Sequence, residues 1–186
     1  DSFQCYAIFR MNIDVADVKL LSSCKGVTTC SFISPDSKSI IYASTHLNDD
    51  ACPPKPDHSK GYVWPLYKSY DIFKADPDGR NIVRLTKTEG YDAEGVFSPQ
   101  GDKIIFTSLR TGDLELFVMK PDGSEVEQLT FEEGYDGGAF FSYDGKWIVW
   151  RASRPQGKQL DDYKSPLAEG LIRTGKLGFF ILILQA

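Results

Sequence analysis

The residues of this sequence that could bind a ligand are aromatic, acidic and basic side chains next to turn signals. Two Gly-Tyr-Asp motifs, at 90–92 and 134–136, each precede a short apolar run. Side chains of these kinds, gathered at one end of a set of strands, form a concave pocket suited to a peptide, a basic segment or a sugar. The predicted ligand-binding residues are Tyr91, Asp92, Glu94, Tyr135, Asp136, Arg110, Arg151, Arg154 and Trp64.

Most of these residues also have a structural interpretation. The tyrosines could fill gaps between repeats, and the aspartates could bond to backbone amides within their turns. The arginines could hold a carboxylate or phosphate through paired hydrogen bonds, or could form ion pairs between neighbouring repeats. Trp64 and Tyr67 could pin a long loop to the fold or, when exposed, anchor a protein partner.

The sequence offers no catalytic motif. A Gly-x-Ser-x-Gly nucleophile turn, a His-Glu-x-x-His zinc signature and a phosphate-binding loop are all absent. His46 and His58 lie near several aspartates, but their spacing matches no metal-ligand motif. Asp92, Glu94 and Asp136 could be paired as in a glycosidase, yet acids that recur in each repeat are first explained by the repeat. We therefore predict no catalytic residue, no metal and no cofactor, and no enzyme unless chain outside this sequence supplies the chemistry.

The elements that position these residues are repeated. Asp122-Gly123 follows Asp78-Gly79, Leu129-Thr130 follows Leu85-Thr86, and Ser142 follows Ser98, always by 44 positions. A fixed period of this length indicates stacked or radially arranged copies of one supersecondary unit.

Each unit is predicted to be a four-stranded antiparallel meander. Short runs rich in Val, Ile, Phe and Tyr lie between turn signals, which is typical of successive strands. The unit at 88–131 predicts strands at about 93–97, 103–108 and 114–119, with a fourth that ends at 130. The turns at 98–101 and 120–123 contain proline, which presets φ, and glycine, which allows positive φ.

Two units carry an insertion between their second and third strands. One copy is displaced by 64 positions, from Ser34 to Ser98, and another by 63, from Arg110 to Arg173, so the predicted insertions lie at 46–68 and 154–174. We expect one domain, 1–186, made of the end of a unit at 1–24, a unit with an insertion at 25–87, a complete unit at 88–131 and an incomplete unit with an insertion at 132–186. In this register Glu94 corresponds to Cys30 and Gly138, so a structural role explains it less well than the other candidates.

These landmarks resemble the repeat of the TolB-like beta-propeller family (PD40-type repeats), whose blades carry a Ser-Pro-Asp-Gly turn, an Asp-Gly turn and a Leu-Thr strand end. The resemblance covers nearly the whole chain and is strongest at 69–153, while Val15 stands in the place of a turn glycine. The segments 26–30, 51–54, 91–94 and 151–155 are similar to a secreted bacterial branch. The resemblance implies an all-β fold: a partial beta-propeller of four-stranded antiparallel blades, with about three blades of a six-bladed ring.

The resemblance also implies a function, although a repeat specifies a scaffold rather than a reaction. We expect a non-catalytic module that binds a protein or peptide on the face that carries the long loops. The alternative is the gating propeller of a larger peptidase of prolyl-oligopeptidase or tricorn type, followed by a propeller polysaccharide lyase. The family resemblance favours a periplasmic or extracellular location, although no signal peptide is visible in this sequence.

Composition agrees with an all-β module. Hydrophobic residues make up 41% of the chain and aromatic residues 13%, while the formal net charge of -5 argues against a nucleic-acid partner. No transmembrane segment is expected, because the apolar tail at 179–184 is too short to span a bilayer. The four cysteines, Cys5, Cys24, Cys30 and Cys52, allow an oxidising compartment. Either Cys30 and Cys52 form a disulfide that tethers the first insertion, or these thiols stay free and buried.

An open arc of blades leaves apolar faces uncovered at both ends, which a monomer tolerates poorly. We therefore expect a truncated product or fragment, or a chain that completes its ring by self-association or with a partner chain. The tail at 179–184 is predicted to be an apolar strand at one of these ends and, without a neighbour, an aggregation hazard.

Overall fold

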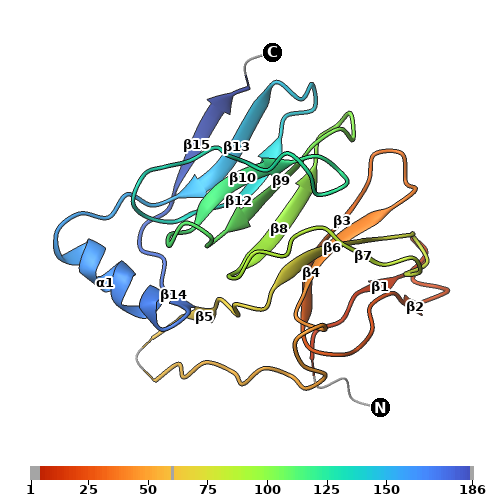
Figure 1. Cartoon of the computed structure of the whole chain (residues 1–186), viewed down its shortest axis with the longest axis horizontal. Helices are drawn as coiled ribbons and strands as arrows, with labels where there is room; N and C mark the ends of the chain where they lie inside the picture. Colours follow the sequence, from red (N-terminus) through yellow and green to blue (C-terminus); the bar gives the residue numbers. More distant parts are fainter. Residues whose placement is uncertain (1–4, 60, 185–186) are drawn as a thin grey trace.

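The computed structural model describes residues 5–59 and 61–184, and its strands form antiparallel sheets that follow one another along the chain. In Figure 1 the three larger sheets lie side by side in chain order. The first blade is β3 (Thr28–Ile33), β4 (Ile40–Ser44), β6 (Asp71–Ala75) and β7 (Val83–Arg84). The second blade is β8 (Asp92–Phe97), β9 (Ile104–Ser108), β10 (Glu115–Met119) and β11 (Glu127–Gln128), and the third is β12 (Asp136–Phe141), β13 (Trp147–Ala152) and β15 (Gly178–Ile183).

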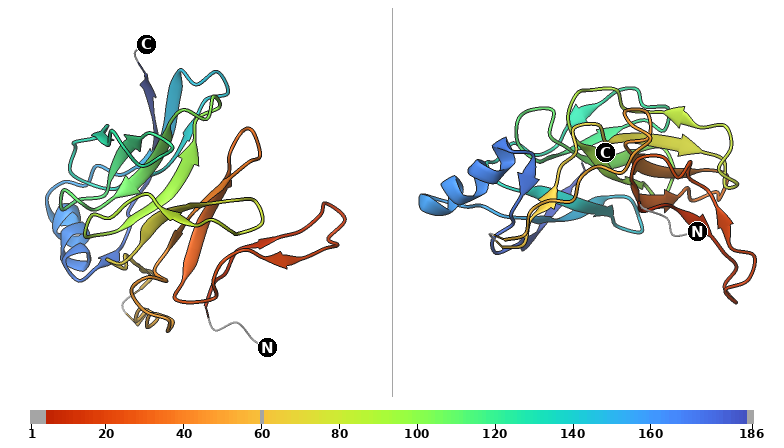
Figure 2. Two further views of the ribbon diagram at one scale, coloured as in Figure 1. Left: turned by 45° about the vertical axis from the view of Figure 1, so that its right-hand side comes forward. Right: turned by 90° about the horizontal axis from the view of Figure 1, so that it is seen from below.

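The prediction of an all-β partial propeller is confirmed. The first three predicted strands of the second blade begin and end within one residue of β8, β9 and β10. Before the first blade, β1 (Phe9–Arg10) pairs with β2 (Lys19–Leu20), as expected for the last two strands of a preceding unit. The left view in Figure 2 shows the larger sheets splayed like part of a fan.

The serine of each first turn is a structural residue. The Ser98 hydroxyl donates to Asp102 (2.7 Å) and accepts from the backbone amide of Lys103 (3.1 Å). In the first and third blades the hydroxyls of Ser34 and Ser142 donate to the aspartates two residues further on. These hydrogen bonds satisfy polar groups that have no backbone partner in a tight turn, so they give the repeated serine a structural role.

The Asp-Gly turn between the third and fourth strands of a blade packs against the blade before it. Gly123 has a φ of +86°, and a Cβ atom there would lie 2.6 Å from the carbonyl oxygen of Leu85. Gly79 makes the same approach to Leu21 one repeat earlier. Glycine is required at this position because a side chain would collide with the fourth strand of the neighbouring blade.

A bulge with left-handed backbone interrupts the innermost strand of each blade. Cys30, Glu94 and Gly138, which are equivalent in the repeat, have φ values of 52°, 58° and 60°. The strand register shifts at each of these positions. A bulge re-aims a side chain beside the axis of the arc, where binding residues are often found.

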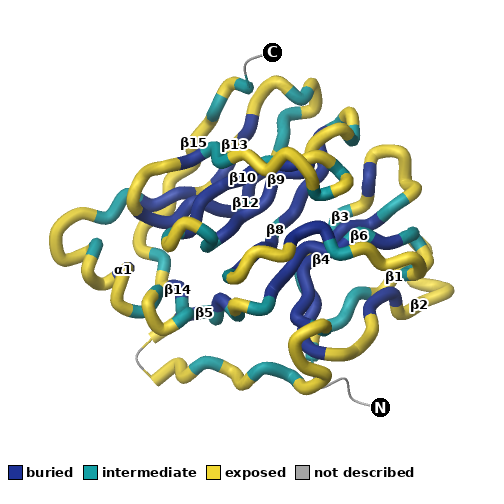
Figure 3. Tube along the Cα trace, viewed as in Figure 1, coloured by how far each residue is buried: buried dark blue, intermediate teal, exposed yellow. Residues whose placement is uncertain are grey.

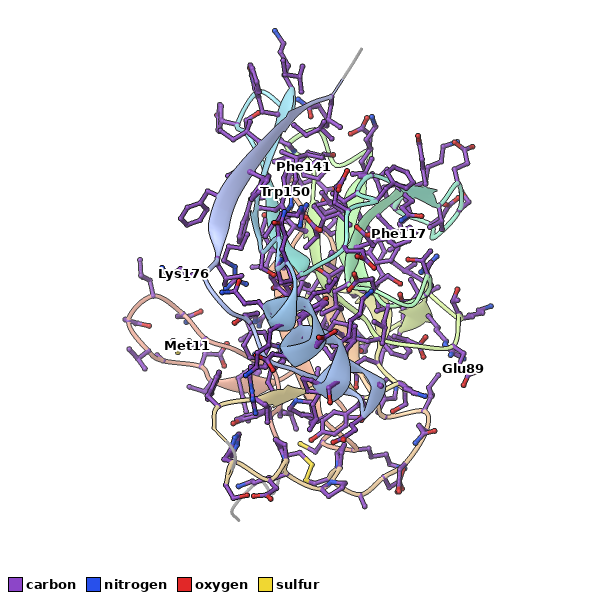
Figure 4. The ribbon with its side chains drawn as sticks, turned by 90° about the vertical axis from the view of Figure 1, so that its left-hand side faces the viewer. Met11, Glu89, Phe117, Phe141, Trp150 and Lys176 are labelled. Carbon is purple, nitrogen blue, oxygen red and sulfur yellow. A yellow bond between two sulfur atoms is a disulfide. The ribbon has the colours of Figure 1, made fainter. Side chains whose placement is uncertain are left out.

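Two apolar layers hold the three blades together. Between the first two blades, Ile41 and Ile72 pack in one cluster with Phe106. Between the second and third, Ile105 and Leu116 pack in one cluster with Ile148 and Trp150. Figure 3 shows buried residues along the facing strands, and Figure 4 shows Trp150 among the crowded side chains of the interior.

The outer side of the third blade exposes apolar residues at the positions that are buried between the other blades. Phe140, Val149 and Phe179 are the repeat equivalents of Val96, Ile105 and Leu116, which are buried between blades. On the third blade the three residues are 53%, 37% and 82% exposed. The predicted apolar strand at the end of the chain is present as β15, and its free edge and outer face have no neighbour among the described residues.

The two insertions meet each other. In the first, β5 (Trp64–Pro65) pairs with β14 (Leu171–Ile172) of the second, and the Leu66 amide donates to the carbonyl of Gly170 (2.7 Å). The second insertion also contains α1 (Lys158–Ala168), which the repeat pattern does not predict. Figure 1 shows α1, β5 and β14 together at one end of the blades.

The predicted Cys30–Cys52 disulfide is wrong, because Cys52 pairs with Cys5. The Thr28 amide donates to the carbonyl of Tyr6, and the Gly26 amide donates to that of Asp50, so both segments reach the same end of β3. The thiol of Cys30 lies at the bulge, exposed and near the Thr29 hydroxyl (3.5 Å). Figure 4 shows the disulfide as a yellow bond.

Within the described ranges, no helix combines the length and the apolar character needed to cross a bilayer.

Candidate ligand-binding face

The loops that follow the second and fourth strands of the blades open on one face, which we call the loop face. It consists of residues 45–59, 61–70, 86–91, 109–114, 130–135 and 153–177. Both insertions and their paired strands belong to it. Two open depressions, of about 830 and 720 Å³, lie on this face.

The two repeated tyrosines are core residues. Tyr91 and Tyr135 belong to one apolar cluster with Leu66 from the first insertion and Tyr163 from the second. Burial raises the pKa of both phenols. Trp64 packs against this cluster, with its ring edge-on to Tyr135 at a centroid distance of 6.3 Å. These contacts join the loop face to the blades, and ligand binding by the three aromatic residues stays a prediction.

Each repeated aspartate is buried beside an arginine of the same blade. Arg110 donates to both carboxylate oxygens of Asp92 at 3.1 Å, and its guanidinium lies over the ring of Phe117 (4.8 Å). Arg154 donates to both oxygens of Asp136 at 2.8 and 2.9 Å. The expectation that such arginines pair between repeats is wrong for Arg110 and Arg154, because each pair joins the first strand of a blade to the end of its second. Arg151 does pair with an acid of the neighbouring blade.

Glu94 links two blades. Its carboxylate accepts from the hydroxyl of Thr107 (2.8 Å) in its own blade and from the backbone amide of Gly138 (2.8 Å) in the next. Arg151 of the next blade lies 3.8 Å away. The bulge therefore turns this acid toward its equivalent position one repeat further on, and a ligand role for Glu94 or Arg151 stays a prediction.

The larger depression surrounds a buried acid, one of whose carboxylate oxygens has no hydrogen-bond donor among the described residues. It lies between the second blade and α1, and its lining includes Leu109, Asp113, Glu115, Gln128, Phe131 and Lys164. Glu115 is only 4% exposed, and its Oε2 atom has no hydrogen-bond partner within the described part of the chain. We call this the Glu115 depression.

The smaller depression is its equivalent one repeat earlier. It is lined by Asp71 and Arg84, which lie 44 positions before Glu115 and Gln128. There the buried acid is paired, since Arg84 Nη2 lies 2.7 Å from Asp71 Oδ2. Burial raises the pKa of Asp71, while the hydrogen bond from Arg84 lowers it.

Burial raises the pKa of Glu115 to about 7. A hydrogen bond from Thr130 and the charge of Arg154 lower this pKa, whereas the charges of Asp136 and Asp113 raise it. The result is a carboxyl group that titrates near neutrality inside a depression, a property concentrated at functional sites.

The comparison with known families decides the assignment of this fold. The family model described as PD40, TolB beta propeller domain, matches residues 61–167, which is more than half of the chain. This chain belongs to the TolB beta propeller domain family.

This chain is also similar to several solved structures. Puromycin hydrolase has a TM-score of 0.55 at 19% identity, over 76% of this chain and 22% of that one. A chain of the nidogen/laminin complex has a TM-score of 0.58 at 15% identity, over 78% and 51%. TolB from Acinetobacter baumannii has a TM-score of 0.45 at 23% identity, over 81% and 44%. The chain spans about half or less of each of these structures.

Sequence reasoning about this TolB-type repeat missed Glu115 and Gln128. Both lie next to landmark positions, and the signal was available in the 44-residue register, where an Asp and Arg pair becomes Glu and Gln. The described residues hold no group of three or more His, Cys, Asp or Glu side chains placed to bind a metal ion.

Proposed function

We propose that this TolB-type propeller is a non-catalytic module that binds a protein or peptide segment on its loop face. The observation that supports this most is the pair of repeat-related depressions on that face, each lined by charged and apolar side chains. Phe131 lines the larger one and is 72% exposed. Exposed aromatic side chains at the edge of a concavity are typical anchors for a partner.

The test compares two exposed aromatic residues on opposite faces. Peptides selected from a displayed library against the immobilised protein would be measured by calorimetry against Phe131→Ala and Tyr143→Ala. Tyr143 is 98% exposed in a turn at the other end of the third blade. We expect a loss of affinity of about tenfold for Phe131→Ala and no change for Tyr143→Ala. Loss with Tyr143→Ala alone would assign binding to the other face.

The chain organisation that goes with this function is one arc. It consists of the end of a blade at 1–24, a blade with an insertion at 25–87, a complete blade at 88–131 and an incomplete blade with an insertion at 132–186. We place the module in the periplasm or outside the cell. The Cys5–Cys52 disulfide supports this location, because disulfides persist in oxidising compartments. Labelling of free thiols in the freshly isolated protein would test it, since two reactive cysteines are expected rather than four.

A second candidate is the substrate-access propeller of a larger peptidase. The similarity to puromycin hydrolase, of which this chain covers 22%, is consistent with such an arrangement. In that case the loop face would admit a substrate peptide to a separate catalytic domain. Peptides bound by this chain would then be cleaved by the full protein, whereas the leading proposal expects them to be bound and released intact.

A further inference from the structure

The starting observation is a difference between two equivalent depressions. In the first blade, the Arg84 guanidinium donates from Nε to the carbonyl of Thr86 (2.9 Å) and from Nη2 to Asp71 (2.7 Å). In the second blade, Gln128 Nε2 donates to the carbonyl of Thr130 (2.7 Å). Gln128 thus reproduces the first bond of the arginine but has no terminal nitrogen for the second.

The acid that this missing nitrogen would reach is buried. Glu115 occupies the position of Asp71, and its Oε2 atom has no hydrogen-bond donor in the described part of the chain. A buried acceptor without a donor is costly, and a buried carboxylate without a cation is more so. A donor that enters from the depression would remove this cost.

The lining of the depression fits a long basic side chain. Glu89, Asp113 and Glu133 surround it with negative charge, and Lys164 is already paired with Glu133. Leu109, Leu167 and Phe131 add apolar surface for a methylene stem. Lys68, also on the lining, is the remaining cation, so the acids are in excess. In Figure 4 Glu89 lies at the margin of the molecule.

We propose that the Glu115 depression binds an arginine side chain of a partner. The guanidinium of that arginine lies beside Glu115, in the place equivalent to that of the Arg84 guanidinium beside Asp71 in the first blade. This rests on the proposed function for the identity of the face and adds the chemistry of the group recognised. Arginine fits better than lysine because one planar guanidinium can bridge the Glu115 carboxylate and neighbouring acceptors at once.

The first test uses N-acetyl-arginine amide as the probe and N-acetyl-citrulline amide, which has nearly the same shape without the charge, as its control. Binding to the intact chain would be followed by nuclear magnetic resonance. We expect saturable shifts at residues of the depression with the arginine probe and none with the citrulline probe. Glu115→Gln should weaken binding tenfold or more. Equal binding of both probes, or unchanged binding by Glu115→Gln, would overturn the proposal.

A second variant places the arginine inside the protein. Gln128→Arg copies the pair seen in the first blade, so its side chain should occupy the site, abolish probe binding and leave the fold intact. The matched variant Arg84→Gln frees Asp71 and should create a second site for the probe. If a folded Gln128→Arg protein binds the probe as tightly as the native chain, the proposal is wrong.

The pH dependence gives an independent readout. The groups that act on Glu115 are Asp113, Asp136, Arg154 and the hydroxyl of Thr130, with Lys68, Glu89, Glu133 and Lys164 on the lining. Since the Glu115 pKa is about 7 and the probe stays charged, affinity should rise about tenfold between pH 6 and 8. A flat profile would contradict an ionised Glu115 as the partner.

Failure of this inference can be distinguished from failure of the proposed function. If selected peptides bind in a Phe131-dependent way but the arginine probe neither binds nor competes, the face binds partners and the arginine site is wrong. If the probe binds through Glu115 but no peptide depends on Phe131, the arginine site holds and the peptide-binding proposal is wrong.

Discussion

At the scale of single residues, the repeat provides its own reference. The same position in neighbouring blades has the same backbone and nearly the same surroundings, so a change of side chain can be read against an internal control. Asp71 with Arg84 and Glu115 with Gln128 form one such comparison. Cys30, Glu94 and Gly138 form another, with a shared left-handed backbone and three different side chains.

We expect Glu115→Gln to change the pH dependence of stability. The folded-state pKa of Glu115 is raised from 4.5 to about 7, so the folded protein holds this proton more tightly than the unfolded chain. The associated stability is present below pH 4.5 and is lost as the pH rises through 7. Relative to the native chain, the variant should gain on the order of 2 to 3 kcal/mol between pH 4 and 8.

Urea unfolding at pH 4, 6 and 8 measures this difference. Glu133→Gln is the control, because Glu133 is exposed and its ion pair with Lys164 lies in solvent. Parallel stability curves for native protein and Glu115→Gln would show that the carboxyl group titrates normally.

At the scale of elements, the Asp-Gly turn is an inter-blade contact as well as a turn. We expect Gly123→Ala to destabilise the protein by at least 2 kcal/mol, because the new Cβ would meet the Leu85 carbonyl and the backbone has positive φ. Gly112→Ala is the matched control, since Gly112 also has positive φ (95°) but open space around it. Its cost should be about 1 kcal/mol. Equal costs in thermal or urea melts would remove the inter-blade explanation.

The disulfide gives a second prediction at this scale. Cys5→Ser should lower the free energy of unfolding by about 2 to 4 kcal/mol, because the bond closes a loop with a sequence separation of 47. Cys30→Ser should change it little, as Cys30 is an exposed free cysteine. Urea melts of both variants measure the difference. A large effect of Cys30→Ser alone would contradict the Cys5–Cys52 pairing and favour a Cys30–Cys52 disulfide.

The strands of the blades and the positions of the two insertions could be predicted from the sequence, while the structure within the insertions could not. Turn residues such as Ser98 and Gly123 have local physical roles and recur at a fixed spacing, so they reveal where strands begin and end. The residues of α1, β5 and β14 take their structure from contacts between two insertions far apart in the chain. The sequence identified charged residues of the site but not their pairing, for the same reason. Which charged residues pair depends on how the strands are placed, as the pair of Asp92 and Arg110 shows.

At the scale of the whole molecule, the outer face of the third blade is an exposed apolar surface. Phe140, Val149 and Phe179 repeat the pattern that is buried between the other blades. We expect the chain to self-associate through this face, and Phe179→Ser to reduce the association. Tyr143→Ser removes an even more exposed aromatic residue from a turn and should have no effect.

Light scattering across a hundredfold range of concentration measures this association. A native chain that stays monomeric throughout, or association that Phe179→Ser leaves unchanged, would contradict the prediction and leave this face to a partner of another kind.

The pairing of β5 with β14 changes how the arc comes apart. In a row of repeats, each unit contacts only its neighbours, so loss of structure can start at one end and travel along the row. Here the first and third blades also contact each other directly through their insertions, so the contacts between blades form a closed cycle. Neither of these blades can separate from the others while β5 and β14 remain paired. The loop face should therefore be the last part of the molecule to unfold when the chain is pulled from its ends.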